Sequence, residues 1–132
     1  IVWSVEIPAA RGQDTGVWAT PALHPSGLLF VPTDSGNLLA VDTTSGLVVW
    51  EDEVGVNAWS SPAIVDDALV IAVDCFTEEP GLRAYDLTDP LSPVEMWQQP
   101  IGTRGCVEST PAVWGGNIFV GSRDGFMYAF GS

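Results

Sequence analysis

The sequence predicts an all-β protein assembled from repeats of four short antiparallel strands. Glycine (14 residues) and proline (10 residues) are spread between short apolar runs, which is typical of a chain with many tight turns. Apolar residues make up 46% of the 132 positions, enough for a packed core rather than a disordered segment. A set of four apolar runs also recurs along the chain, so the sequence is an array of similar units.

The first run of each unit, run A, carries a proline followed by an alanine. Its three copies are residues 18–23, 59–64 and 108–113. A proline has no backbone N–H to donate to a neighbouring strand. Pro21, Pro62 and Pro111 therefore predict that run A is an edge strand in every unit.

Runs B and C follow, and they are almost continuously apolar. Run B covers residues 28–32, 68–73 and 117–121, and run C covers residues 37–42, 82–87 and 126–130. Strands of this composition belong to sheets that are covered on both faces. Gly, Asp and Asn fill the turns between runs A and B, where they supply backbone conformations that other residues resist. Runs B and C therefore predict the centres of stacked sheets.

Run D is predicted as the outer strand of each unit. It covers residues 47–53 and 94–98, and it occurs once more at residues 1–7. Acidic residues such as Glu6, Glu51 and Glu95 accompany it, and charge on an outer strand protects an exposed edge from unwanted pairing. Each copy also holds a tryptophan, and the three tryptophans recur at a spacing of 47 residues.

Four-stranded sheets with a proline-marked inner edge and a charged outer edge, arranged radially, are the blades of a β-propeller. Residues 1–132 are predicted to form a single propeller segment with strands in the order D-ABCD-ABCD-ABC. Residues 17–53 form blade 1, residues 59–98 form blade 2, and residues 108–130 form three strands of blade 3. Residues 1–7 are the outer strand of a preceding blade, or they complete a blade in trans.

The turn between runs C and D of blade 1 carries a motif made of Ala40, Asp42, Ser45, Gly46 and Trp50. It resembles the docking motif of PQQ-like β-propeller repeats, which have threonine where this chain has the serine. That family includes quinoprotein alcohol dehydrogenases, outer-membrane assembly lipoproteins of the BamB type, and sensor propellers of bacterial kinases. The resemblance covers the whole chain and implies a bacterial propeller.

The other two copies of the motif are less complete. Blade 2 keeps Ala84, Asp86 and Trp97 in a longer turn, and blade 3 keeps Ala129 with Gly131 at the aspartate position. In the family, the tryptophan packs across the gap between blades, where a large aromatic ring gives a strong contact between sheets. The resemblance therefore implies a structural docking role for a set of residues. These are Trp3, Trp50, Trp97, Ala40, Asp42, Gly46, Ala84, Asp86 and Ala129.

Three blades are too few to close a ring, since propellers have about four to eight. Two wide apolar sheet faces would stay bare, and bare faces of that size mark an interface. We expect either a second copy, which would give a six-bladed homodimer, or the further blades of a larger propeller. In the homodimer, residues 1–7 would complete blade 3 of the partner.

The chain is strongly acidic, with 17 Asp and Glu residues against four basic residues and a formal net charge of -13. Nucleic acid is therefore a poor partner, because binding it relies on basic side chains that release counterions from phosphates. No apolar run approaches the about 20 residues that a membrane-spanning helix needs. A protein or a peptide is a more suitable partner.

One face of the disc is predicted to carry the least regular loops, those between runs B and C and between runs D and A. The candidate binding residues on this face are Trp18, Trp59, Arg11, Arg104, Glu78 and Glu79. Trp18 and Trp59 either pack on neighbouring blades or form an aromatic rim for a peptide or a flat ligand. The second reading follows from the tendency of function to concentrate in loops on a rigid scaffold.

Two cysteines, Cys75 and Cys106, lie in loops that flank the boundary between blades 2 and 3. They are either two buried free thiols or, as we predict, a disulfide. A disulfide would favour an oxidising compartment, periplasmic or extracellular. Two cysteines cannot complete a zinc site, and no metal site is expected.

These observations predict a non-catalytic propeller that serves as a protein-interaction or scaffolding domain, without a cofactor. Two alternatives stay open: a fragment of a quinoprotein dehydrogenase, which would bind PQQ with calcium, and a sensor propeller of a bacterial receptor or kinase. The resemblance to the dehydrogenases implies a vicinal cysteine pair, a catalytic aspartate and calcium ligands from several blades. The sequence shows no such set, so no catalytic residue is predicted.

Overall fold

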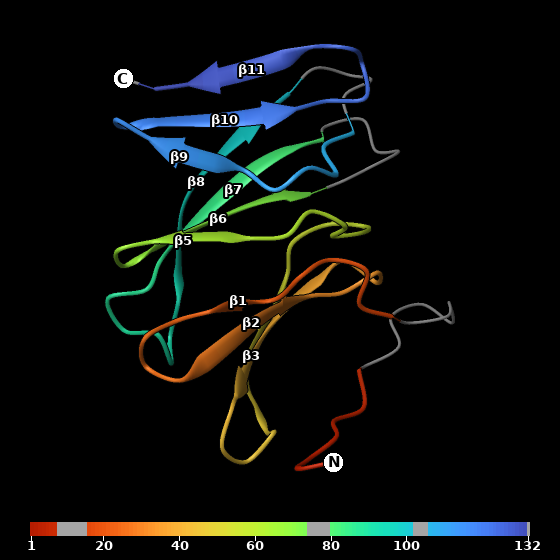
Figure 1. Cartoon of the computed structure of the whole chain (residues 1–132), viewed down its shortest axis with the longest axis vertical. Helices are drawn as coiled ribbons and strands as arrows, with labels where there is room; N and C mark the ends of the chain where they lie inside the picture. Colours follow the sequence, from red (N-terminus) through yellow and green to blue (C-terminus); the bar gives the residue numbers. More distant parts are fainter. Residues whose placement is uncertain (8–15, 74–79, 102–105, 132) are drawn as a thin grey trace.

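Three antiparallel sheets stacked one upon another make up the computed structural model, which describes residues 1–7, 16–73, 80–101 and 106–131. Figure 1 shows the N-terminus beside the first sheet and the C-terminal strand at the opposite end of the stack. The described residues contain eleven strands and no helix, so nothing in that part of the chain could cross a membrane as a helix. The predicted all-β class is confirmed.

Each sheet corresponds to one predicted blade. Blades 1 and 2 have the strand orders β1-β2-β3-β4 and β5-β6-β7-β8, and blade 3 has the order β11-β10-β9. The strands of blade 1 are β1 (Ala22–Leu23), β2 (Leu28–Pro32), β3 (Asn37–Asp42) and β4 (Val48–Glu53). Those of blade 2 are β5 (Ala63–Val65), β6 (Ala68–Val73), β7 (Gly81–Asp86) and β8 (Val94–Pro100). Those of blade 3 are β9 (Ala112–Trp114), β10 (Asn117–Gly121) and β11 (Met127–Phe130).

Run A forms the edge strand of every blade, as the prolines predict, but its strands are shorter than run A itself. β1 has only two residues and begins after Pro21. The residues ahead of the prolines bond to the next blade instead: the Thr20 N–H donates to Ser61 Oγ at 2.9 Å, and Ser60 Oγ donates to the Ser109 carbonyl at 2.7 Å. The inner ends of the blades are therefore joined by hydrogen bonds between neighbouring sheets.

The outer strand of each complete blade pairs with a bulge at the same place. In blade 1, Ala40 lies opposite Trp50, and the register then shifts so that Val41 lies opposite Val48. Blade 2 repeats this shift just after the pair of Ala84 and Trp97. A bulge re-aims side chains locally, and here it places each motif tryptophan across from the small motif alanine.

The sheets pack front to back, where the front face of a blade is the face that carries its motif alanine. The front of blade 1, with Phe30 and Ala40 fully buried, shares one core cluster with Ile71 and Tyr85 on the back of blade 2. The front of blade 2, including Ala84, packs on the back of blade 3 in a second cluster. This explains why β6 and β7 are buried on both faces, as predicted, and why the front of β2 and β3 is buried.

The two ends of the stack differ from its centre. On the back of blade 1, Trp3 and Ile7 pack against Val31, Leu39 and Val41. Residues 1–7 form no strand in the single chain, so the prediction that they are an outer strand of another blade stays a prediction. At the other end, the front of blade 3 is uncovered. Its exposed residues are Ala112, Trp114, Met127 and Ala129.

Candidate binding face

Trp50 lies between blades 1 and 2. Its ring meets that of Tyr85 edge to face, with centroids 5.8 Å apart and planes at 78°. Tyr85 is buried, and its hydroxyl donates a 2.7 Å hydrogen bond to Asp52 Oδ2 on β4. Burial, and then the Asp52 carboxylate, raise the pKa of the Tyr85 hydroxyl. This aromatic pair and its hydrogen bond connect the outer strand of blade 1 to the third strand of blade 2.

Trp3 packs on the turn between β3 and β4 of blade 1. Its Nε1 donates to the Thr43 carbonyl at 2.8 Å, and its ring covers Gly46, where an added Cβ would lie 2.7 Å from a ring carbon. Gly46 has a φ of +75°, a conformation that residues with a Cβ adopt at a cost. The turn therefore needs glycine at this position for its backbone and for the tryptophan above it.

The motif aspartates organise the turns that follow β3 and β7. Asp42 Oδ1 accepts hydrogen bonds from the Ser45 N–H (2.7 Å), the Ser45 hydroxyl (2.9 Å) and the Thr44 N–H (3.0 Å). The bonds from Ser45 are the main reason why the pKa of Asp42 lies below its usual value. Asp86 does the same with the hydroxyl and N–H of Thr88, and its pKa is lowered too.

Trp97 lies at the boundary between blades 2 and 3 and is 37% exposed. It borders a pocket of about 360 Å³. The other residues that line this pocket are Gln99, Gly116, Ile118, Phe130 and Gly131. Ala129, the motif alanine of blade 3, is exposed on the uncovered front face, unlike the buried Ala40 and Ala84.

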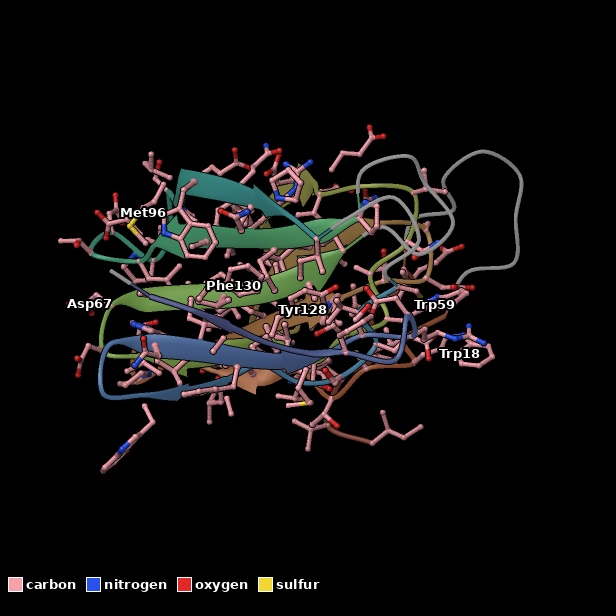
Figure 2. The ribbon with its side chains drawn as sticks, turned by 90° about the horizontal axis from the view of Figure 1, so that it is seen from above. Trp18, Trp59, Asp67, Met96, Tyr128 and Phe130 are labelled. Atoms are coloured by element: carbon pink, nitrogen blue, oxygen red, sulfur yellow. The ribbon has the colours of Figure 1, made fainter. Side chains whose placement is uncertain are left out.

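Trp18 and Trp59 come together at one end of the stack. Figure 2 shows the two rings side by side, while Asp67 and Met96 lie at the opposite end. The ring centroids are 6.2 Å apart and the planes differ by 29°, a stacked arrangement. Trp59 is half-buried and its Nε1 donates to the Asp34 carboxylate, whereas Trp18 is 78% exposed. The structure thus places this pair at a shared position on the predicted binding face.

The other residues predicted for this face fall outside the described part of the chain. These are Arg11, Arg104, Glu78, Glu79 and Cys75. Cys106 is buried and disulfide-bonded. Because Cys75 is not among the described residues, its pairing with Cys106 stays a prediction.

Two further residues belong to this end of the molecule, and the sequence analysis did not assign them to it. Asp34 fixes the Trp59 ring, although 25 positions separate the two residues in the sequence. Glu108 heads run A of blade 3, as Trp18 and Trp59 head run A of blades 1 and 2, and it pairs with Arg123 at 3.1 Å. The alignment of the A runs could have revealed Glu108, but no local pattern points to Asp34.

A family model described as "Outer membrane protein assembly factor BamB" matches residues 1–91. The chain belongs to the BamB family. The expected resemblance to PQQ-like, BamB-type repeats is therefore confirmed, and so is the partial β-propeller.

Individual BamB proteins support the same relationship. The chain is 26% identical over 133 aligned positions to BamB of Escherichia coli (strain K12) and of Shigella dysenteriae serotype 1 (strain Sd197). In both cases 97% of this chain aligns with only 31% of the relative, so the chain spans about a third of their length. The crystal structure of BamB from Moraxella catarrhalis superposes with a TM-score of 0.64 at 22% identity, covering 80% of this chain and 30% of that one. This likeness shows the fold.

Proposed function

We propose that this chain forms part of a β-propeller that works as a non-catalytic protein-interaction module in the assembly of outer membrane proteins. The observation that carries the proposal is the 78% exposed Trp18, stacked on Trp59 at the loop end of a rigid stack of blades. Aromatic side chains held on a rigid scaffold are the usual anchors of protein recognition. Family membership suggests the process in which the module takes part, because the relatives are outer membrane protein assembly factors.

The motif residues support this assignment by what they do in the fold. Trp3, Trp50 and Asp42 form contacts between blades or within turns, so the features shared with quinoprotein enzymes build the propeller. Among the residues that the structure describes, no group of three or more His, Cys, Asp or Glu side chains could hold a metal ion.

The proposed module also needs its end faces covered, by a second copy of the chain or by further blades. Trp50 pairs with Ala40 and Trp97 pairs with Ala84. If residues 1–7 of a second copy add to the free edge of β11, the same register sets Trp3 opposite Ala129. This arrangement would complete blade 3 with a fourth strand by strand addition.

We place the module in the periplasm. The relatives take their name from outer membrane assembly, and the disulfide at Cys106 fits an oxidising compartment.

Binding of an unfolded outer membrane protein tests the proposed function. The immobilised chain should bind a urea-denatured outer membrane β-barrel protein saturably in biolayer interferometry, and bind a urea-denatured cytosolic enzyme of similar size more weakly. Trp18→Ala should weaken the first interaction, whereas Met96→Ala, which shortens an exposed side chain on the outer strand of blade 2, should not. Equal binding of both denatured proteins, or no binding, would overturn the proposal.

A second experiment tests its non-catalytic part. Adding PQQ and calcium should leave the visible absorbance unchanged and give no dye reduction with alcohols. A response in both assays would favour a dehydrogenase fragment.

A further inference from the structure

The first residues of the three A runs form a row across the blades. Trp18, Trp59 and Glu108 hold equivalent places in blades 1, 2 and 3, and the strands β1, β5 and β9 that follow them are neighbours in the stack. The hydrogen bonds from Thr20 to Ser61 and from Ser60 to Ser109 join the same segments. The row is therefore fixed by the docking of the blades and does not depend on one loop.

Trp18 is held in this row while most of its indole stays exposed. It stacks on Trp59, whose own ring is fixed by the hydrogen bond from Nε1 to Asp34. The N–H of Asp34 in turn donates to the Gly16 carbonyl at 2.9 Å, two residues before Trp18. A large apolar ring gains free energy when a partner removes it from water, and a ring that is already ordered loses little entropy on binding.

The charge of the surroundings decides which partner suits this ring. The chain carries a net charge of -13, and the Asp34 carboxylate lies beside Trp59 in the row. Glu108, in the third position, shares its charge with Arg123. The two arginines in the described part of the chain are already paired, Arg83 with Glu95 and Arg123 with Glu108. A field of this sign attracts cations and repels acidic partners.

We propose that the Trp18 ring, stacked on Trp59, binds an arginine side chain from an extended segment of a partner protein. A guanidinium is planar and weakly hydrated, so it stacks on an indole face while the acidic surroundings balance its charge. Lysine is a less suitable match, because its compact ammonium is more strongly hydrated. The inference deepens the proposed function and rests on it, since it names the side chain that this face recognises.

The test uses three fluorescein-labelled nine-residue peptides of Gly and Ser that differ only at three positions, which hold Arg, Lys or Gln. Fluorescence anisotropy is measured against the wild-type chain and against Trp18→Ala, Trp18→Phe and Met96→Ala. The last variant is the control, because Met96 is an exposed apolar residue on the outer strand β8. It lies at the opposite end of the molecule from Trp18 (Figure 2).

We expect the Arg peptide to bind most tightly and the Gln peptide least. Trp18→Ala should weaken binding of the Arg peptide by about 3- to 30-fold, the range of cation–π contacts, and Trp18→Phe should weaken it less. Met96→Ala should leave it unchanged. Circular dichroism should show that the variants stay folded, and the comparison of Arg with Gln on the wild-type chain does not depend on any variant.

Several results would overturn the inference. One is equal affinity for the Arg and Gln peptides, which would indicate that the charge of the guanidinium group does not contribute to binding. Another is an equal loss in Trp18→Ala and Met96→Ala, which would indicate that the Arg peptide is attracted to the acidic protein in general and not to the Trp18 ring. If the denatured outer membrane protein binds but the Arg peptide does not, the proposed function survives and this inference fails.

Discussion

At the scale of single residues, position 46 requires glycine for two reasons: the backbone conformation of the turn and the tryptophan ring that packs on it. Its φ of +75° resembles the +78° of Gly116, but only Gly46 lies under a tryptophan ring. An alanine Cβ would lie 2.7 Å from the Trp3 ring at position 46 and would meet nothing within 4 Å at position 116. The two glycines therefore separate backbone strain from steric overlap.

We predict that Gly46→Ala destabilises the chain more than Gly116→Ala does. Gly116→Ala should cost only the left-handed backbone strain, about 1–2 kcal/mol, whereas Gly46→Ala should add the displacement of Trp3. Urea unfolding followed by circular dichroism measures both changes. Equal losses would mean that the contact between Trp3 and Gly46 adds nothing to stability.

The turn aspartates make stability depend on pH at the acidic end. Hydrogen bonds lower the pKa of Asp42 and Asp86 from the ordinary value of 3.8. Their stabilising effect is therefore present above that value and is lost as the pH falls through the lower pKa of the folded state. Asp42→Asn keeps a hydrogen-bond acceptor but cannot titrate, so we expect a smaller drop in melting temperature than in the wild type between pH 5 and about pH 2. An identical drop in both proteins would contradict this account.

At the scale of strands and sheets, Tyr85 tests the contact between blades 1 and 2. Tyr85→Phe removes the hydrogen bond to Asp52 but keeps the ring against Trp50, so it should cost about 1 kcal/mol. Tyr85→Ala removes a buried ring and should cost about 3–5 kcal/mol, as large truncations in a core do. Denaturant midpoints should rank the two variants in this order. Similar losses would show that the hydrogen bond, not the ring, dominates the contact.

Periodicity and turn chemistry predicted the central strands well, because these depend on local sequence. The bounds of β2, β3, β6 and β10 agree with runs B and C. Run A was predicted too long, because hydrogen bonds to the next blade replace pairing within the sheet. At the predicted binding face, the sequence singled out Trp18 and Trp59 either as packing residues or as an aromatic rim, but their stacking and the role of Asp34 depend on how blades dock. No pattern along the chain encodes a contact of that kind.

At the scale of the whole molecule, the uncovered front of blade 3 makes association the expected state. The chain has a mass of 14.0 kDa, and light scattering should report about twice that value if a second copy covers the bare faces. Met127→Glu, which charges the front face at a residue that is 75% exposed, should shift the mass toward the monomer. Met96→Glu on β8 serves as the control, because Met96 is also exposed but lies on the outer strand of blade 2. A monomer that unfolds with ordinary stability would contradict the prediction.

The front-to-back order of the sheets gives the assembly a direction. A blade that docks on the front of blade 3 presents a new front of its own, so each addition recreates the surface that it has just covered. Growth of this kind stops only when curvature brings the last front onto the first back, as in a closed ring; otherwise it continues as a filament. The angle between successive blades therefore decides whether the protein forms a finite particle or a fibre.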